Sequence, residues 1–244
     1  MKHRLYISPS RLRHPLDPGR RIELERERAH YLTRVLRLRR GEVIECFDGA
    51  GHAWSATLIE ASPRSATLLI GDEVAAEAEP EPRLHLAQGL LKGASMDLVV
   101  QKATELGGTD LWPILAERSN VPADTARQQR KLQHWQRVIE SAAEQSGALH
   151  LPRLHPVQSL QAFLAAAPEA RLVLLDPGAP PLPVALPRGP TCVLVGPEGG
   201  WSAGERRAAA EAGATRYGLG RRILRGETAP LAALAAVRHG WGWR

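Results

Sequence analysis

The sequence predicts an α/β protein with a small β domain at its N-terminus, and two observations support this. Between residues 42 and 70, short apolar runs alternate with turn residues, as in an antiparallel β unit. After residue 83, strand and helix patterns alternate, which favours a mainly parallel sheet covered by helices. The stretch Glu73–Pro82 between them is acidic, contains prolines and has no apolar face. It predicts a linker at 75–82 between domains at 1–74 and 83–244.

In the N-terminal domain, the pattern predicts one short helix and three strands. The helix is expected at 27–36, ended by Gly41, with an inner face formed by Tyr31, Leu32, Val35 and Leu36. The turn 48–51, Asp-Gly-Ala-Gly, is a hairpin signal. The three strands are expected at 42–47, 53–59 and 65–70.

In the C-terminal domain, five strands and five helices are expected. Short apolar runs predict the strands at 84–87, 111–115, 172–175, 191–195 and 215–218. Helical spacing of apolar residues predicts helices at 96–106, 126–145, 159–166, from 203 for about ten residues, and 231–238. Ser202 followed by Glu205 is a capping box, and the proline-rich stretch 178–190 is expected to be a loop.

Two local details of these elements can also be predicted. Ser95 is the expected N-cap of the helix at 96–106, whose apolar stripe would be Leu98, Val99, Ala103 and Leu106. Pro113 cannot donate to a ladder, so the strand at 111–115 is expected at an edge or to end there.

Composition indicates a cytoplasmic globular protein. Hydrophobic residues make up 43% of the chain, no apolar run is long enough to span a membrane, and the N-terminus lacks a signal-peptide core. The two cysteines, Cys46 and Cys192, lie in separate apolar runs. They are expected to be buried free thiols in a reducing compartment, not a disulfide or a metal site.

The positive charge is concentrated at the N-terminus. The chain carries a formal net charge of +6, but residues 1–40 hold 12 Lys and Arg against 4 Asp and Glu, a net of +8. The remainder therefore carries −2. Arginine contacts phosphate in bidentate fashion and stacks on bases, so RNA contact is predicted here; a merely solvated arginine-rich surface is the alternative. The candidate RNA-binding residues are Arg28, Arg34, Arg37 and Arg39.

Two glycine-rich turns each follow a predicted strand and precede a predicted helix. They are Gly196-Pro197-Glu198-Gly199-Gly200 and the stretch from Gly218 to Gly226. Such turns bind ligands in open α/β sheets, because backbone N–H groups are free and glycine permits close approach. The spacing matches neither a dinucleotide fingerprint nor a P-loop. The alternative is that the glycines serve only to make tight turns.

The chain resembles the knotted SPOUT methyltransferases, and within them the family that methylates uridine N3 of 16S ribosomal RNA. The first turn and the block Leu219-Gly220-x-Arg222-Ile223-Leu224-Arg225-x-Glu227-Thr228-Ala229 carry the resemblance, together with 90–107, 117–119 and 140–146. An arginine usual in the family soon after the last stretch is displaced here, which leaves a substrate role for 147–153 open. The resemblance implies a deep trefoil knot, S-adenosylmethionine (SAM) as cofactor and a homodimer. It also implies a PUA-like RNA-binding barrel at the N-terminus, entered at Ala29–Arg37.

The expected site combines cofactor-binding turns with arginines. The cofactor would be held by Leu175, Leu194, Val195, Gly196, Pro197, Glu198, Gly199, Gly200, Tyr217, Leu219, Gly220, Ile223, Leu224 and Thr228. Methyl transfer to N3 builds negative charge on the uracil oxygens, which a fixed guanidinium stabilises. The candidates are Arg118, Arg222 and Arg225, each of which could instead hold an ion pair or a phosphate. Glu198, Glu227 or water could accept the proton.

Other polar residues are expected to be structural. Salt bridges within the fold are favoured for Lys92, Glu105 and Glu117. The nine histidines form no metal-binding spacing, so no metal is expected, and His30, His52 and His85 are interpreted as surface or packing residues.

Two rival functions fit the same sequence. One is a SPOUT ribose 2′-O-methyltransferase, and the other is a non-catalytic RNA-binding factor of ribosome assembly. The expected partner is small-subunit ribosomal RNA or the 30S subunit.

Overall fold

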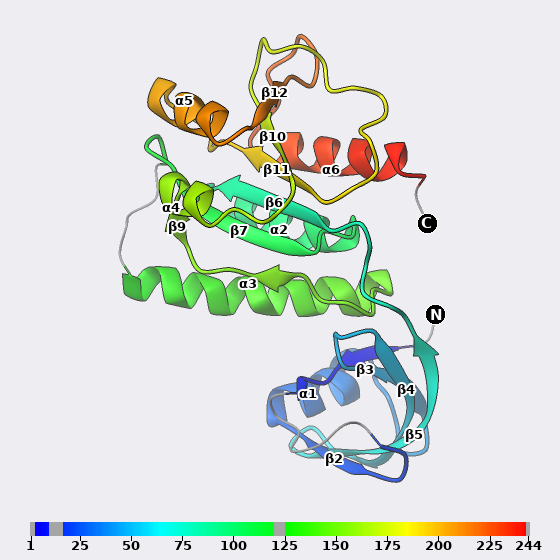
Figure 1. Ribbon diagram of the computed structural model, residues 1–244. Helices are drawn as coiled ribbons and strands as arrows, with labels where there is room; N and C mark the ends of the chain where they lie inside the picture. The colour runs from blue at the N-terminus through cyan, green and yellow to red at the C-terminus, as the bar shows by residue number, and fades with distance from the viewer. Residues whose placement is uncertain (1–2, 10–16, 120–124, 243–244) are drawn as a thin grey trace. The chain divides into compact units, whose positions relative to one another are not determined.

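The computed structural model describes residues 3–9, 17–119 and 125–242, which fall into two compact units (Figure 1). The first contains the chain up to Glu79 together with Ala143–Leu151, and the second contains Pro80–Ala142 and the chain from Pro152 onward. The linker expected at 75–82 begins too early, because a strand continues to Ala76. The predicted C-terminal domain, 83–244, includes residues 143–151, whereas the structure groups them with the first unit. This grouping depends on tertiary contacts, which the local sequence does not indicate.

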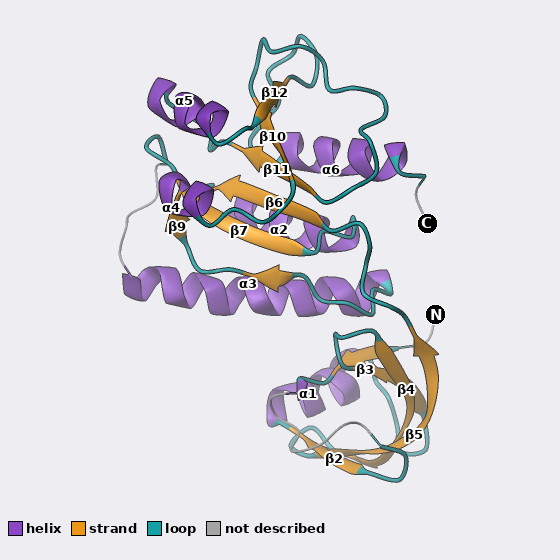
Figure 2. Ribbon diagram, in the orientation of Figure 1, coloured by secondary structure: helices purple, strands orange, loops and turns teal. Residues whose placement is uncertain are grey.

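The first unit is built on a five-stranded sheet in the order β1-β3-β4-β5-β2 (Figure 2). All its neighbouring strands are antiparallel except β1 and β3. The strands are β1 Arg4–Tyr6, β2 Arg21–Leu24, β3 Val43–Phe47, β4 His52–Ala61 and β5 Ala66–Ala76. Register shifts between β4 and β5 mark bulges, which bend the long hairpin around the core.

The helix expected at 27–36 is two different elements. A short α-helix, α1 Arg26–His30, continues as a π-helical turn, η2 Tyr31–Val35. Leu32 is buried, but the wider turn leaves Val35 59% exposed, so the expected inner face is wrong at that position. The chain leaves the helix at Arg37, which adopts a left-handed φ of 58°, before reaching Gly41.

Residues 143–151 complete a small apolar cluster of the first unit. Ala143 and Leu149 pack with Phe47 and Ala53. Glu144 Oε1 accepts hydrogen bonds from the Tyr6 N–H at 3.0 Å and from Arg28 Nη1 at 2.7 Å. This segment is therefore part of the first unit's core.

The second unit is an α/β domain built on a seven-stranded parallel sheet in the order β12-β10-β11-β6-β7-β8, with β9 also paired to β7. The strands are β6 Leu84–Gly89, β7 Asp110–Leu115, β8 Arg153–Leu154, β9 Gln158–Ser159, β10 Arg171–Leu175, β11 Thr191–Val195 and β12 Thr215–Tyr217. The trefoil knot implied by the resemblance remains a prediction.

Pro113 lies in a strand with neighbours on both sides, so the expected edge position is wrong. On one side it lies opposite Gln88 of β6. On the other side, β8 pairs with Asp110 and Leu111, and β9 pairs with Ile114 and Leu115. The missing N–H of Pro113 therefore falls in the gap between β8 and β9, where the ladder needs no donor.

Helices cover both faces of this sheet. They are α2 Ala94–Glu105, α3 Thr125–Ser146, α4 Leu160–Ala165, α5 Ala203–Glu211 and α6 Thr228–Gly240. The pairs α2 with α6 and α4 with α5 pack on opposite faces (Figure 2). None of the helices within the described ranges is both long and apolar enough to cross a membrane.

Two expectations about α2 are corrected. Its N-cap is Gly93, with φ 57°, and Ser95 lies inside the first turn. The helix starts two residues earlier than expected, and its buried side chains are Met96, Val99, Val100, Ala103 and Thr104. Leu98 is 37% exposed, and Leu106 lies beyond the last helical residue.

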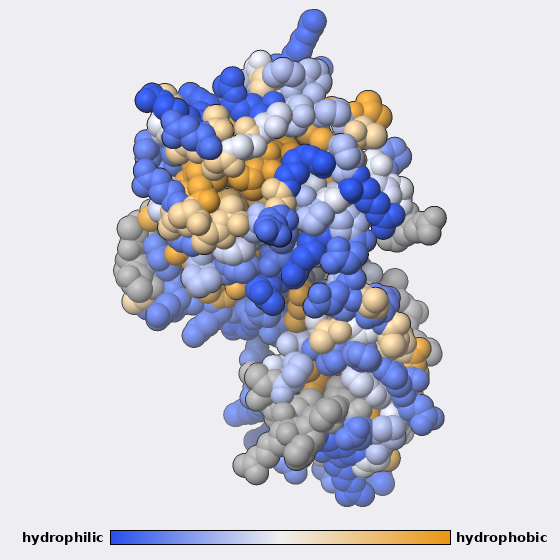
Figure 3. Space-filling model, in the orientation of Figure 1, coloured by the Kyte–Doolittle hydropathy of each residue, from blue (hydrophilic) through white to orange (hydrophobic). Residues whose placement is uncertain are grey.

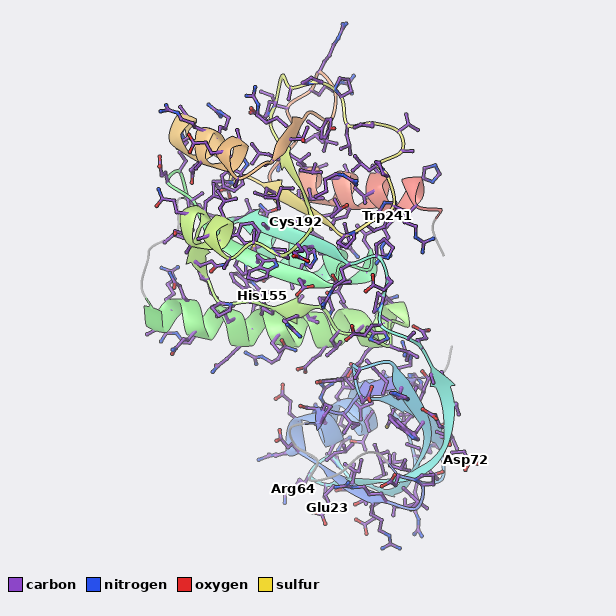
Figure 4. The ribbon with its side chains drawn as sticks, in the orientation of Figure 1. Glu23, Arg64, Asp72, His155, Cys192 and Trp241 are labelled. Carbon is purple, nitrogen blue, oxygen red and sulfur yellow. The ribbon has the colours of Figure 1, made fainter. Side chains whose placement is uncertain are left out.

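Both thiols are buried and unpaired, as predicted. Cys192 lies in the middle of the parallel sheet (Figure 4). Burial strongly raises the pKa of both thiols, so neither is a ready nucleophile.

Candidate active site

Several loops gather at the carboxyl edge of the parallel sheet, where α/β proteins bind ligands. They follow β7, β10, β11 and β12, and a cavity of about 400 Å³ opens among them. Figure 3 shows an apolar area over β10 and β11, bordered by hydrophilic side chains. The described residues that line the cavity are Arg118, Leu175, Asp176, Pro177, Val195, Gly196, Pro197, Glu198, Gly199, Gly200, Trp201, Arg206, Tyr217, Gly218, Leu219, Gly220, Arg222, Ile223, Leu224, Arg225, Gly226 and Ala229.

The cavity brings together twelve of the fourteen expected cofactor-binding residues; Leu194 and Thr228 lie off its wall. Leu194 is fully buried in the core, because alternate residues of a strand face opposite sides of the sheet. Thr228 begins α6, and its neighbour Ala229 takes the place on the wall.

Five lining residues outside the two predicted turns were missed: Asp176, Pro177, Trp201, Arg206 and Ala229. Gly218 and Gly226, at the ends of the second turn, also line the cavity but were not named as cofactor-binding residues. Asp176 and Pro177 directly follow β10 at the same edge, so strand order could have found them. Trp201 and Arg206 carry no ligand signal in the sequence, because the path of the chain into α5 places them there.

The turn after β11 is closely packed. The N–H of Gly200 donates to the Pro197 carbonyl at 2.8 Å, closing a tight turn. A Cβ on Gly199 would lie 2.9 Å from Arg118 Cβ, and one on Gly196 would lie 3.1 Å from Gly200 Cα. A side chain at 199 would displace Arg118, and one at 196 would press on the backbone of its own turn, so glycine fits best at both positions.

All three candidate catalytic arginines lie on the cavity wall, joined by Arg206. Arg118 Nη1 donates to the Gly199 carbonyl at 3.2 Å. Arg225 is different, since its side chain is 86% exposed and its Nη1 lies 4.0 Å from Glu227 Oε1. Asp176, an acidic residue of the wall, is paired with Arg216 at 3.2 Å, which offsets its negative charge. The remaining charge on the wall is mainly that of the arginines, and such donors stabilise a substrate that develops negative charge during the reaction.

The other polar candidates have mainly structural contacts. Glu198 Oε1 accepts the Lys92 N–H at 3.0 Å, and Glu117 donates its N–H to Glu205. Glu105 pairs with Lys102 Nζ at 2.8 Å, as a structural salt bridge. For Lys92 and Glu117 the contacts are made by backbone N–H groups, where salt bridges were expected.

Within the part of the chain that the structure describes, no group of three or more His, Cys, Asp or Glu side chains is arranged so that it could hold a metal ion. His30 is exposed and His85 is buried. His52 is exposed, stacks on Trp54 and lies 2.6 Å from Glu73, which raises the pKa of His52.

The candidate RNA-binding arginines divide into two groups. Arg28 is half-buried and ion-paired with Glu144 at 2.7 Å, so its guanidinium has a structural partner. Arg34 lies in η2, and Arg37 and Arg39 lie along the chain that leaves it; all three side chains are exposed. These three remain candidates for contact with RNA.

Comparison with known proteins agrees with this geometry. The model of an RNA methyltransferase domain matches residues 78–238, and that of an RNA methyltransferase PUA domain matches residues 24–71. The ribosomal RNA small subunit methyltransferase E of Synechocystis is 34% identical over 97% of this chain and 77% of its own length. The Bacillus subtilis protein of that name is 31% identical over 87% of this chain and 88% of its own.

Solved structures agree over nearly the whole chain. The ribosomal RNA small subunit methyltransferase E of Neisseria gonorrhoeae, bound to SAM, has a TM-score of 0.86 and 34% identity, and covers 98% of both chains. A methyltransferase of Legionella pneumophila with bound SAM has a TM-score of 0.89 and 30% identity, again over 98% of both chains. The first unit is therefore a PUA-like domain and the second an RNA methyltransferase domain, and this chain belongs to the family of the ribosomal RNA small subunit methyltransferases E.

Proposed function

We propose that this protein transfers the methyl group of SAM to N3 of a uridine in small-subunit ribosomal RNA. The observation that carries the proposal is the cavity built from two glycine turns and lined by arginines, in a chain whose solved relatives hold SAM. Because the proposed substrate is ribosomal RNA, we also propose the cytoplasm as the compartment and the 30S subunit or its RNA as the partner.

The residues of the cavity fit such a cofactor. Leu175, Val195, Leu219 and Leu224 supply apolar surface for an adenine ring, and the backbone groups of the turns supply polar contacts. When bound, SAM supplies an electrophilic methyl group. The protein's own task is to hold N3 in line with that group, to exclude water and to stabilise the charge that N3 deprotonation leaves on uracil. The wall arginines are placed for the last part.

Mapping the product tests the proposal. Small-subunit RNA from cells lacking the modification is incubated with the protein and SAM, and its nucleosides are then separated and identified. We expect 3-methyluridine. A methyl group on a ribose 2′-oxygen would indicate the rival methyltransferase, and absence of SAM binding by calorimetry would indicate a pure RNA-binding factor.

We further propose a homodimer, which the family resemblance implies. Ile223, on the cavity wall, is 85% exposed, and contact with a second copy of the chain would remove this side chain from water. Sedimentation of the protein should give twice the chain mass, and Ile223→Glu should reduce it toward one chain mass. A single-chain mass for the unmodified protein at all concentrations would contradict the dimer.

Enlarging the glycines of the cavity should weaken SAM binding. Gly196→Val places its branches against the backbone of Gly200 and Trp201, and Gly220→Val forces a β-branched residue to φ 99°. We expect SAM affinity to fall at least about tenfold for each, or about 1.4 kcal/mol, in folded protein. Calorimetry measures the affinity, and Gly189→Val, where a Cβ meets open space, is the control. Unchanged affinity in both variants would remove these turns from the site.

RNA affinity should depend on salt through the arginines beside η2 in the first unit. Removing one arginine that binds a phosphate should reduce the slope of log affinity against log salt concentration by roughly 0.7–0.9 in magnitude. Charge reversal at Arg34, Arg37 and Arg39 is therefore expected to reduce the slope and to leave SAM binding unchanged. Arg64→Glu, in the turn between β4 and β5, changes the charge by as much as Arg37→Glu and is its control. Equal slopes for Arg37→Glu and Arg64→Glu would place the RNA surface elsewhere.

A further inference from the structure

A buried carboxylate beside the cavity connects two elements that are far apart in sequence. Glu205 is 7% exposed and lies in the first turn of α5. Its Oε2 accepts the Ser202 N–H at 2.8 Å, while Ser202 Oγ accepts the Glu205 N–H at 3.1 Å, which completes the capping box predicted from the sequence. Its Oε1 accepts the Glu117 N–H at 2.9 Å, from the loop after β7.

The capping box alone does not explain this arrangement. A cap needs one carboxylate oxygen and is normally exposed, whereas both oxygens of Glu205 are used and the group is buried. Among the described residues, no Lys, Arg or His forms an ion pair with it, so N–H groups and the helix dipole alone stabilise the charge. Burying a carboxylate costs free energy unless hydrogen-bond donors remain next to it. The Glu117 and Ser202 N–H groups supply these donors, so the carboxylate holds both of them in place.

The loop that Glu205 holds carries Arg118. Within it, the Ala116 N–H donates to Ser119 Oγ at 3.1 Å and the Ser119 N–H donates to the Ala116 carbonyl at 2.9 Å. The loop is therefore a closed turn, and its Glu117 N–H is bonded outward to α5. The next residue, Arg118, reaches the cavity wall and donates to the Gly199 carbonyl.

Arg118 is thus held at two points: Glu205 binds the N–H of the preceding residue, Glu117, and the Arg118 guanidinium donates to the Gly199 carbonyl. The backbone of Arg225 is also held, because its carbonyl accepts the Thr228 and Ala229 N–H groups, but its side chain is 86% exposed and its Nη1 lies 4.0 Å from Glu227 Oε1. Stabilisation of developing charge depends on donors that are in place before the reaction. By this criterion Arg118 is the better prepared of the two.

We infer that Glu205 is a positioning residue: its carboxylate holds the loop after β7 so that Arg118 lies at the cavity wall in the geometry that methyl transfer requires. This rests on the proposed function, since Arg118 is assigned there to the charge on uracil. Glu205 itself touches neither substrate nor cofactor in this scheme.

Glu205→Gln separates the two tasks of the side chain. Glutamine is accepted in a capping box, but its amide has one oxygen only, so either the cap or the bond to Glu117 must break. Ser202→Ala is the matched control, because it removes a cap bond from the same helix and leaves Glu205 and Glu117 bonded. Both should lower the melting temperature by a few degrees, about 2–4 °C for each cap interaction removed.

The rates should separate the variants. We expect Glu205→Gln to slow single-turnover methylation at saturating RNA and SAM by about 10–100-fold, the effect of misplacing a catalytic group. Its SAM affinity should stay within a few fold of the unmodified protein, and Ser202→Ala should keep the unmodified rate. In an Arg118→Ala background, Glu205→Gln should cause no further decrease in rate, because the two act through one group.

Three results would overturn the inference: equal rates for Glu205→Gln and Ser202→Ala, a full additional decrease in the Arg118→Ala background, or rapid exchange of the Glu117 amide hydrogen. The last is measured on the unmodified protein, so the inference stays testable if Glu205→Gln does not fold; we expect strong protection there despite the loop position. Failure of the unmodified protein to methylate RNA would instead contradict the proposed function and is seen before any variant is made.

Discussion

Arg118→Ala is expected to slow single-turnover methylation by about 10²–10³-fold, the typical effect of removing one preorganised donor. The guanidinium lies on the cavity wall, is hydrogen-bonded to Gly199 and belongs to a loop tied to α5. SAM and RNA affinities should stay within a few fold, because the donor acts on charge that develops only during the reaction. Rapid mixing of excess protein with labelled SAM and RNA measures the rate.

Arg225→Ala is the informative comparison. The sequence alone favours Arg225, since it lies in the block 219–229 next to the proposed adenosyl slot, but its side chain is 86% exposed. If Arg225 holds an RNA phosphate, saturating RNA at low salt restores the rate of Arg225→Ala and leaves Arg118→Ala slow. The opposite result, rescue of Arg118→Ala with a persistent defect in Arg225→Ala, would return the chemical role to Arg225.

Asp110→Ala is expected to destabilise the second unit by about 3–5 kcal/mol, as for other buried charges whose partners are left unpaired. Asp110 is 3% exposed at the start of β7. His155 Nε2 lies 2.9 Å and Thr109 Oγ1 3.0 Å from its oxygens. His85 Nδ1 is 3.1 Å away but is not aligned for a hydrogen bond. Figure 4 shows His155 close to the sheet, and its ring stacks on Trp112 with centroids 3.3 Å apart.

The pH dependence of stability follows from the same cluster. Burial raises the pKa of Asp110, but the hydrogen bonds from His155 and Thr109 and the nearby His85 outweigh this and hold it well below its usual range. Since the folded pKa is depressed, the stabilisation is fully present above the unfolded value of about 3.9 and disappears as the pH falls toward the folded pKa. The difference in stability between Asp110→Ala and the unmodified protein should therefore decrease as the pH falls below about 4, the range where an ordinary aspartate titrates.

Urea unfolding between about pH 3 and pH 8 measures this difference across the range where an ordinary aspartate titrates. Asp72→Ala is the control, because that carboxylate is exposed on β5 (Figure 4), where surface substitutions change stability by no more than about 0.5 kcal/mol. A difference for Asp110→Ala no larger than for Asp72→Ala would show that the buried cluster is not a stabilising one.

Local chemistry made much of the fold predictable. The buried strand at 191–195, the capping box at 202 and the parallel arrangement after residue 83 follow from apolar runs and capping residues, and the structure confirms them. The three-residue β1 and the four-residue β2 were missed because such short strands have no periodicity to detect. The π-helical turn at 31–35 was missed because the spacing of apolar residues does not distinguish the hydrogen-bond pattern of an α-helix from that of a short π-helix.

The part of the site that is formed by a single loop could be predicted from the sequence. The turn 196–200 can be recognised from its glycines, and all five of its residues line the cavity. Leu194 was assigned to the site because it lies close in sequence to the turn 196–200. Side chains alternate between the two faces of a strand, and that of Leu194 points into the hydrophobic core. The bond between Glu205 and Glu117 spans 88 residues, and nothing local to either residue indicates it. Contacts of this kind depend on the order of strands in the sheet.

The placement of Ala143–Leu151 with the first unit has a practical consequence for anyone dissecting this protein. A fragment that stops at Glu79 would lack Ala143 and Leu149, and so part of the cluster that covers Phe47 and Ala53. It would also leave Arg28 and the Tyr6 N–H without the Glu144 carboxylate. The PUA-like domain therefore cannot be isolated intact by a single truncation of the chain. A functional version needs the segment 143–151 grafted back through a short connection, and a binding assay on the simple truncation would report on a damaged domain.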